Sequence, residues 1–117
     1  VVTYFGNVAK GGAGLITSEV ADVDPNRRYN ANVMGAFDDS LIPGWKRLAE
    51  AVHEHGAKLF AQLIHAGQIP LLDAPGQLGA VGPSPIPHIY NRNVIPHVLS
   101  KEEMDEIKQL YINAVEG

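Results

Sequence analysis

AKLFAQLIHAGQ, residues Ala57–Gln68, is the stretch from which the rest of the chain can be interpreted. Lys58–Ile64 within it is a short apolar run, long enough for one buried strand and too short for a helix of ordinary length. The run contains one uncharged amide, Gln62, and ends in polar groups and a glycine at His65–Gln68. In parallel α/β folds, ligands gather at the carboxyl ends of the strands. This stretch therefore offers a hydrogen-bonding side chain within a strand, followed by a polar rim that suits a ligand.

Helix and strand patterns flank this run on both sides. Residues 14–20 (GLITSEV) predict a second buried strand. A last helix begins after Ser100, which has the Ser-x-x-Glu spacing of a capping box with Glu103. Two further helices are indicated by apolar residues at spacings of three and four. The predicted apolar faces are Val1, Tyr4, Phe5 and Val8 in residues 1–10, and Leu41, Trp45, Leu48, Ala49 and Val52 in a helix that starts between Asp38 and Pro43 and ends near His55.

The predicted order is helix, strand, long loop, helix, strand, long loop, helix, which is typical of a parallel sheet. The loops after the strands, residues 22–43 and 69–99, are long, whereas the links before the strands are short. This asymmetry indicates a TIM (β/α)8 barrel with long loops at the carboxyl ends of its strands. A complete barrel needs eight strands and typically about 250 residues. We therefore interpret these 117 residues, which begin with Val rather than Met, as less than half of a domain.

The composition excludes several classes of protein. Apolar residues make up 45% and charged residues 19% of the chain, so a packed core is expected. The net charge of −4 argues against binding to nucleic acid or to an anionic membrane. No apolar run approaches the roughly 20 residues of a membrane span, and no signal peptide is visible. The absence of cysteine fits a reducing compartment, and we expect a cytoplasmic protein.

Gln62 is the most informative polar residue. An amide carries two hydrogen-bond donors and an acceptor, and burying it without partners is costly. It either bonds to neighbouring strands or recognises the edge of a ligand. A planar heterocycle with alternating N–H and C=O groups along its edge would suit it.

Two other side chains, those of Glu19 and His65, are compatible with either a catalytic or a structural role. Glu19, at the carboxyl end of the first predicted strand, is either a general base or a carboxylate tied to an arginine or to backbone amides. His65, at the end of the next strand, either contacts a ligand or fixes a loop, and we favour the structural role. Lys58 lies at the wrong end of its strand for Schiff-base chemistry.

Two motifs suggest a phosphate-binding loop and a metal site, but their positions in the predicted elements do not fit these functions. The glycines of residues 11–14 close a helix and open a strand, whereas a phosphate-binding loop follows a strand and opens a helix, so we predict a simple turn. His53 and His55 are two residues apart on a helix and point about 200° apart, so they are poorly placed to share a metal. We therefore predict no metal site.

Four stretches resemble the old yellow enzyme family, in the order and at about the spacing of that family. The resemblance is to its NADH:flavin oxidoreductase branch, which includes 2,4-dienoyl-CoA reductase-like and enoate reductase-like enzymes. The stretches are KGGAGLITSE (Lys10–Glu19), IPGWKRLAEAVHEHGAKLFAQLIHAGQ (Ile42–Gln68), GPSPIP (Gly82–Pro87) and LSKEEMDEIKQLYINA (Leu99–Ala114).

The resemblance implies an FMN-binding (β/α)8 barrel, of which residues 1–117 are a part truncated at both ends, with the second and third strands visible. It implies that Gln62 hydrogen-bonds the pyrimidine edge of the flavin. It also implies that Val20 lies against the flavin, at a position where the family usually has a smaller residue. Gln68 stands where the family's HAG motif usually continues with arginine.

The resemblance implies an ene-reductase that passes hydride from NAD(P)H via FMN to an activated C=C bond of an electron-poor alkene or an enoyl-CoA-like substrate. The catalytic residues of such enzymes lie outside residues 1–117, so none is assigned here. In some relatives a 4Fe-4S cluster and FAD are bound by C-terminal parts, and a homo-oligomer is compatible with the family. The alternatives are another TIM-barrel enzyme, such as a lyase or a hydrolase, and a non-catalytic binding fragment.

Overall fold

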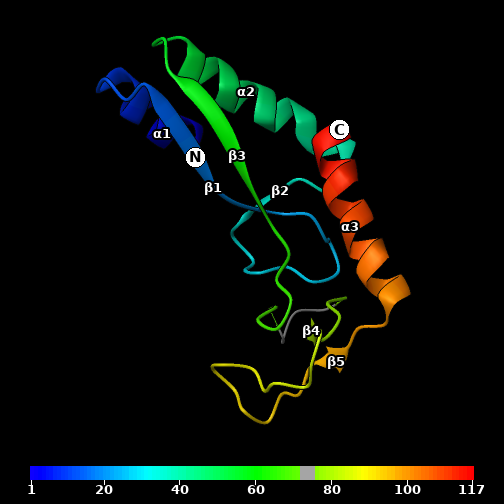
Figure 1. Cartoon of the computed structure of the whole chain (residues 1–117). Coiled ribbons are helices and arrows are strands. Elements are labelled where there is room, and N and C mark those ends of the chain that lie inside the picture. Colours follow the sequence, from blue (N-terminus) through cyan, green and yellow to red (C-terminus); the bar gives the residue numbers. More distant parts are fainter. Residues whose placement is uncertain (72–75) are drawn as a thin grey trace.

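The computed structural model of the chain describes residues 1–71 and 76–117 (Figure 1). Pro75 of the predicted loop 69–99 therefore lies outside the described residues. The three predicted helices and the two predicted strands occur in the predicted order, and three two-residue strands that were not predicted lie within the two long loops. The elements are α1 (Val2–Lys10), β1 (Leu15–Asp22), β2 (Met34–Gly35), the 3-10 turn η1 (Asp39–Leu41), α2 (Ile42–His53), β3 (Lys58–Ile64), β4 (Val81–Gly82), β5 (His97–Val98) and α3 (Lys101–Glu116).

The strands form parallel pairs. The main sheet has the order β2-β1-β3, and β4 and β5 form a separate two-stranded parallel sheet. The bounds of β3 are those predicted, whereas β1 runs two residues further than the predicted strand, to Asp22. The predicted parallel α/β fold class is thus confirmed, and both long loops leave the carboxyl ends of β1 and β3, as Figure 1 shows.

The core lies between the β1–β3 pair and the helices α1 and α2, which pack against each other on one face of the strands (Figure 1). The predicted apolar face of α2 is confirmed, because its Leu48 and Val52 are 1% and 0% exposed. Truncating a buried leucine such as Leu48 to alanine typically costs about 2–5 kcal/mol. The buried cluster consists of Ala9, Ile16, Leu48, Val52 and Ala57.

The predicted apolar face of α1 is wrong in part. Tyr4 is 67% exposed and Val1 58% exposed, whereas Ala9 is buried and Val2 and Phe5 pack against the core. The reason is that α1 contacts α2 as well as the sheet. The contact with α2 turns the face that carries Ala9 inward.

Glycines make the two tight links before the strands. Gly12, between α1 and β1, has φ +106°, and Gly56, between α2 and β3, has φ +79°. Residues with a side chain rarely adopt such angles. The predicted turn at residues 11–14 is confirmed, and α2 ends at His53, two residues before the predicted end near His55.

The capping box predicted for the last helix is present at the start of α3. The Ser100 hydroxyl accepts the backbone N–H of Glu103, and the Glu103 carboxylate accepts the backbone N–H of Ser100, both at 3.1 Å. The carboxyl end of α3 lies beside the start of α2 (Figure 1). In the described part of the chain, no helix combines the length and the apolar character needed to cross a membrane.

Candidate functional site

The β1–β3 pair has one face covered by helices and one face open. Leu59 of β3 packs against the core, and Ala61 and Leu63 line a groove with residues of α2. Because successive side chains of a strand point to opposite faces, Phe60 and Gln62 point away from α2. Both are exposed, Phe60 to 60%. The open face therefore carries a large apolar ring and an amide from β3.

Val20 and Gln62 lie opposite each other on this open face. The ladder pairs Thr17 with Phe60 and then Val20 with Gln62, so β1 uses one more residue than β3 over the same distance. Such an extra residue is a β-bulge. In a regular ladder Glu19, two residues after Thr17, would stand opposite Gln62. The bulge puts Val20 there in its place.

The side chain of Ser18 completes the ladder at the bulge. Its hydroxyl accepts the backbone N–H of Gln62 at 3.2 Å and donates to the carbonyl of Glu19 at 2.7 Å. Ser18 is 2% exposed, so water has little access to these groups. Sequence periodicity does not reveal this role, because the register between β1 and β3 depends on contacts between distant segments.

The carboxamide of Gln62 makes no hydrogen bond within the described residues, and only its backbone is engaged. Of the two alternatives left by the sequence, bonding to neighbouring strands is thus not seen. Two donors and one acceptor remain open toward the uncovered side of the sheet. A ligand with an alternating donor and acceptor edge fits these groups.

His65 and Asp24 join the carboxyl ends of β3 and β1. The Nε2 of His65 lies 3.1 Å from Oδ2 of Asp24, and its Nδ1 accepts the backbone N–H of Gly67 at 3.1 Å. Since Nδ1 is an acceptor, the ring proton is on Nε2 and is donated to the carboxylate. Both side chains are buried. His65 thus has the structural role that the sequence favours.

The pKa of Asp24 lies below its ordinary value, because the groups around the carboxylate lower the pKa by more than burial raises it. Burial is the largest single influence and raises the pKa. The hydrogen bonds from His65 and from the backbone N–H of Asn26, together with the charge of Arg27, lower it by more. Asp24 is therefore an ionised structural group at neutral pH.

Asp22 and Arg28 fix the loop that follows β1. Asp22 is fully buried, and its Oδ2 lies 2.6 Å from Nε of Arg28. Arg28 also donates to the carbonyl of Val33 and lies over the ring of Phe37, 5.2 Å from its centroid. Sequence reasoning missed this pair, although two aspartates at a strand end followed by two arginines were a usable signal.

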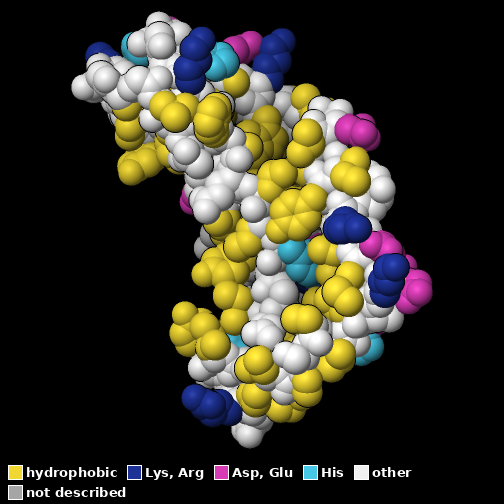
Figure 2. Space-filling view, viewed as in Figure 1, with side chains coloured by type: hydrophobic (Ala, Val, Ile, Leu, Met, Phe, Trp, Pro, Cys, Tyr) yellow, Lys and Arg dark blue, Asp and Glu magenta, His cyan; other side chains and the backbone are white. Residues whose placement is uncertain are grey.

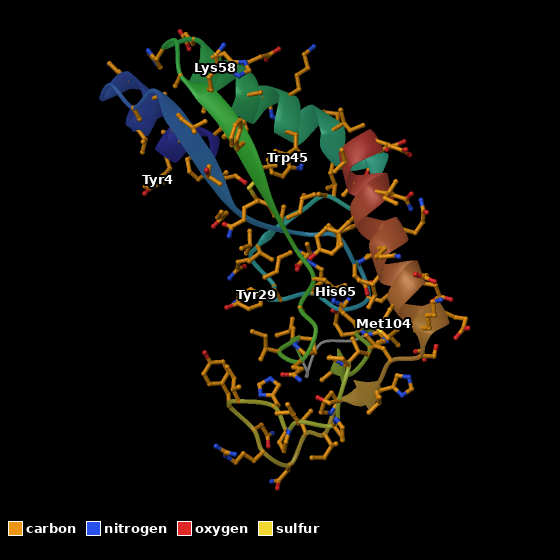
Figure 3. All side chains as sticks on the ribbon, viewed as in Figure 1. Tyr4, Tyr29, Trp45, Lys58, His65 and Met104 are labelled. Carbon is orange, nitrogen blue, oxygen red and sulfur yellow. The ribbon has the colours of Figure 1, made fainter. Side chains whose placement is uncertain are left out.

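Two other residues considered for chemistry lie away from the open carboxyl end. Glu19 is an exposed residue in the bulge and does not end the strand, so the position predicted for it is wrong. It forms no ion pair within the part of the chain that is described. Lys58 lies at the amino end of β3, opposite to His65 (Figure 3). Lys58 is therefore far from the end where barrel enzymes do their chemistry.

The remaining histidines are separate from one another. His88 is buried and accepts the backbone N–H groups of Tyr90 and Asn91, which closes its own loop. His97 is exposed and pairs with Glu103 at the start of α3. Among the described residues, no three metal-ligating side chains come together.

A hydrophobic surface lies beyond the carboxyl ends of the strands. Figure 2 shows hydrophobic side chains gathered over the loops on this side of the molecule. Members that are more than half exposed are Ile86, Ile89, Tyr90 and Ile95. An open sheet face and exposed apolar loops at the same end define the candidate site as the carboxyl-end region of a parallel α/β unit, where barrel enzymes bind small molecules.

Comparison with known proteins gives the family of this unit. The NADH:flavin oxidoreductase / NADH oxidase family matches residues 1–116, and the chain belongs to that family. It is 36% identical over 115 residues to the NADH oxidase of Thermoanaerobacter brockii, covering 97% of this chain and 18% of that protein. It is 39% identical over 115 residues to a metal reductase of Desulforamulus reducens, covering 97% and 17%. It is 37% identical over 99 residues to an NADPH dehydrogenase of Listeria monocytogenes serotype 4a, covering 85% and 28%.

Solved structures agree with this assignment. A 2-naphthoyl-CoA reductase in complex with 2-naphthoyl-CoA superimposes with a TM-score of 0.83 at 27% identity, covering 97% of this chain and 19% of that chain. Morphinone reductase in complex with tetrahydroNAD gives 0.80 at 28% identity, covering 97% and 35%. The fold is also that of part of the Old Yellow Enzyme from Pichia sp. AKU4542, with a TM-score of 0.81 at 22% identity, covering 97% and 32%. The predicted old yellow enzyme relationship is thus confirmed, and the chain spans less than a third of the curated relatives named here.

Proposed function

We propose that residues 1–117 form part of an FMN-binding (β/α)8 barrel, with β1 and β3 as its second and third strands. The observation that carries this proposal is the pairing of Val20 with Gln62 on the face of the sheet that no helix covers. In a closed barrel this face is the interior, and cofactors are bound at its carboxyl end. Almost the whole of this chain, 97%, superimposes on a part of 2-naphthoyl-CoA reductase and of morphinone reductase, and this agreement supports the same proposal.

The residues present suit FMN. The Gln62 carboxamide has open donors and an open acceptor, and these complement the N–H and C=O groups along the pyrimidine edge of the flavin. Val20, opposite Gln62, offers an apolar surface to the ring. Its branched side chain is larger than the residue usual in the family. The buried pairs Asp22–Arg28 and Asp24–His65 hold the loops around this place rather than react.

We further propose that the whole protein is an ene-reductase. When bound, FMN supplies the transfer of hydride from NAD(P)H to an activated C=C bond. Within residues 1–117, Gln62 orients the cofactor, and the acid that protonates the substrate belongs to a later part of the barrel. Morphinone reductase with tetrahydroNAD and 2-naphthoyl-CoA reductase with its thioester support a reduced nicotinamide and an enoyl-CoA-like or other electron-poor alkene as the two reactants.

The relatives fall into two length classes, and we propose the longer class for this protein. The two relatives that match 97% of the chain are the long proteins, of which it covers 17% and 18%. The Listeria relative matches 85% of the chain, which covers 28% of it. In a long member, further C-terminal parts would hold a 4Fe-4S cluster and FAD. Iron, acid-labile sulfide and both flavins are measurable in the purified intact enzyme, and FMN alone would contradict the proposal.

The FMN assignment is tested in the intact enzyme, meaning the full polypeptide that contains residues 1–117. Replacing Gln62 with leucine removes the carboxamide and keeps a side chain of similar size. We expect the dissociation constant of FMN to rise about tenfold, as for the loss of one or two hydrogen bonds. The matched control is Gln109→Leu on α3, whose amide bonds only Asn113 within the described residues.

The two variants give distinct outcomes. The assignment predicts weaker FMN binding and a changed flavin absorption spectrum for Gln62→Leu, and no change for Gln109→Leu. Equal affinity and equal spectra in all three proteins would overturn the role of Gln62. A purified intact enzyme that carries no flavin and binds none on addition would overturn the function itself.

A further inference from the structure

The bulge in β1 decides which side chain stands beside Gln62. Thr17 pairs with Phe60, and a regular strand would then bring Glu19 opposite Gln62. The extra residue advances β1 by one position, so that Val20 takes this place. The bulge thus places an apolar side chain, rather than the Glu19 carboxylate, directly opposite Gln62 in the ladder.

The Ser18 hydroxyl is the group that closes the ladder across the bulge. The backbone N–H of Gln62 donates to Oγ of Ser18 at 3.2 Å, and Oγ–H donates to the carbonyl of Glu19 at 2.7 Å. The hydroxyl therefore connects a donor of β3 to an acceptor of β1. Ser18 is 2% exposed, so its loss would leave both backbone groups with little access to water.

We infer that Ser18 is a positioning residue for the cofactor site. It touches no cofactor itself and acts by fixing the backbone of Gln62 and by keeping Val20, rather than Glu19, beside the carboxamide. Its effect on flavin rests on the function proposed above, whereas its effect on the backbone of Gln62 does not. Because side chains alternate along a strand, a shift of β1 by one residue in its register with β3 would bring Glu19 opposite Gln62.

The test compares Ser18→Ala with Ser18→Thr in the intact enzyme. Threonine keeps the hydroxyl and alanine removes it. For Ser18→Ala we expect hydrogen exchange at the Gln62 amide to become at least about tenfold faster, since its acceptor is lost. We also expect the dissociation constant of FMN to rise about fivefold to tenfold and the flavin reduction potential to become more negative, because a carboxylate nearer the flavin disfavours the gain of electrons. Ser18→Thr should restore all three values.

The matched control is Ser40→Ala, which removes an exposed hydroxyl in η1, outside the ladder between β1 and β3. If Ser18→Ala does not fold, Ser18→Cys tests the same bond, because its thiol fills the space but accepts hydrogen bonds weakly. Unchanged amide exchange and flavin binding in a folded Ser18→Ala protein would overturn the inference. Failure of the wild-type enzyme to bind FMN would instead overturn the proposed function, and the exchange rate at Gln62 would still decide the role of Ser18.

Discussion

Val20 of β1 and Gln62 of β3 are partners in the parallel ladder, and both belong to the face of the sheet that α1 and α2 leave open. Two residues that are 42 positions apart in the sequence are brought together by the bulge at Ser18. An apolar surface and an unengaged carboxamide side by side suit one edge of a planar, hydrogen-bonding ligand. The site proposed for this chain depends on that pairing.

Gly35 is required by close packing. A Cβ atom at this position would lie 2.6 Å from Cε1 of Phe37 and 2.8 Å from Cδ1 of Leu41. Gly35→Ala should therefore lower the free energy of unfolding of the intact enzyme by about 1–3 kcal/mol, as overpacking does. Urea denaturation measures the change.

Gly44 provides the control for this substitution. It lies in α2, and the nearest atom to its Cβ would be Nη2 of Arg47 at 3.8 Å. Gly44→Ala should stabilise the enzyme by about 0.4–1 kcal/mol, because alanine has less conformational freedom to lose on folding. Equal effects of the two glycine substitutions would contradict the packing described around Gly35.

Arg28 compensates a buried charge. Asp22 has a side chain that is 1% exposed, and Arg28 is its ion-pair partner at 2.6 Å. Arg28→Met should destabilise the intact enzyme by about 3 kcal/mol, because it leaves a carboxylate buried without its cation. Arg47→Met, at an exposed position of α2, should change stability by less than about 0.5 kcal/mol. A similar loss in both variants would show that the Asp22 pair adds nothing specific.

The ionisation of Asp24 makes the free energy of unfolding depend on pH in the acidic range. Its pKa in the folded protein lies below the ordinary value, so the folded state binds fewer protons than the unfolded state near that pH. The contribution of Asp24 is complete above about pH 4 and is lost as the pH falls through its lowered pKa. Asp24→Asn should make the free energy of unfolding less steep with pH in this acidic range. An equally steep acid limb in the variant would refute the assignment.

Local signals in the sequence were sufficient for several elements. The apolar run Lys58–Ile64 has the bounds of β3, and the Ser100–Glu103 spacing gives the capping box of α3. These features depend on neighbouring residues, so they can be predicted without the rest of the fold. The position of Gln62 in β3 follows from the same run.

Contacts between distant segments could not be predicted in this way. The strand β1 extends to Asp22 because a buried pair with Arg28 satisfies a carboxylate that otherwise suggests a loop. The exposure of Tyr4 follows from the packing of α1 against α2. The bulge at Ser18 depends on the register with β3, which no local pattern encodes.

The most direct measurement is a crystal structure of the intact enzyme loaded with FMN. Our account predicts that the carboxamide of Gln62 lies at about 2.9 Å from the nitrogen or oxygen atoms of the flavin pyrimidine edge, with Val20 beside the ring. A flavin that binds without contacting Gln62, or a Gln62 side chain packed beneath α2, would contradict it.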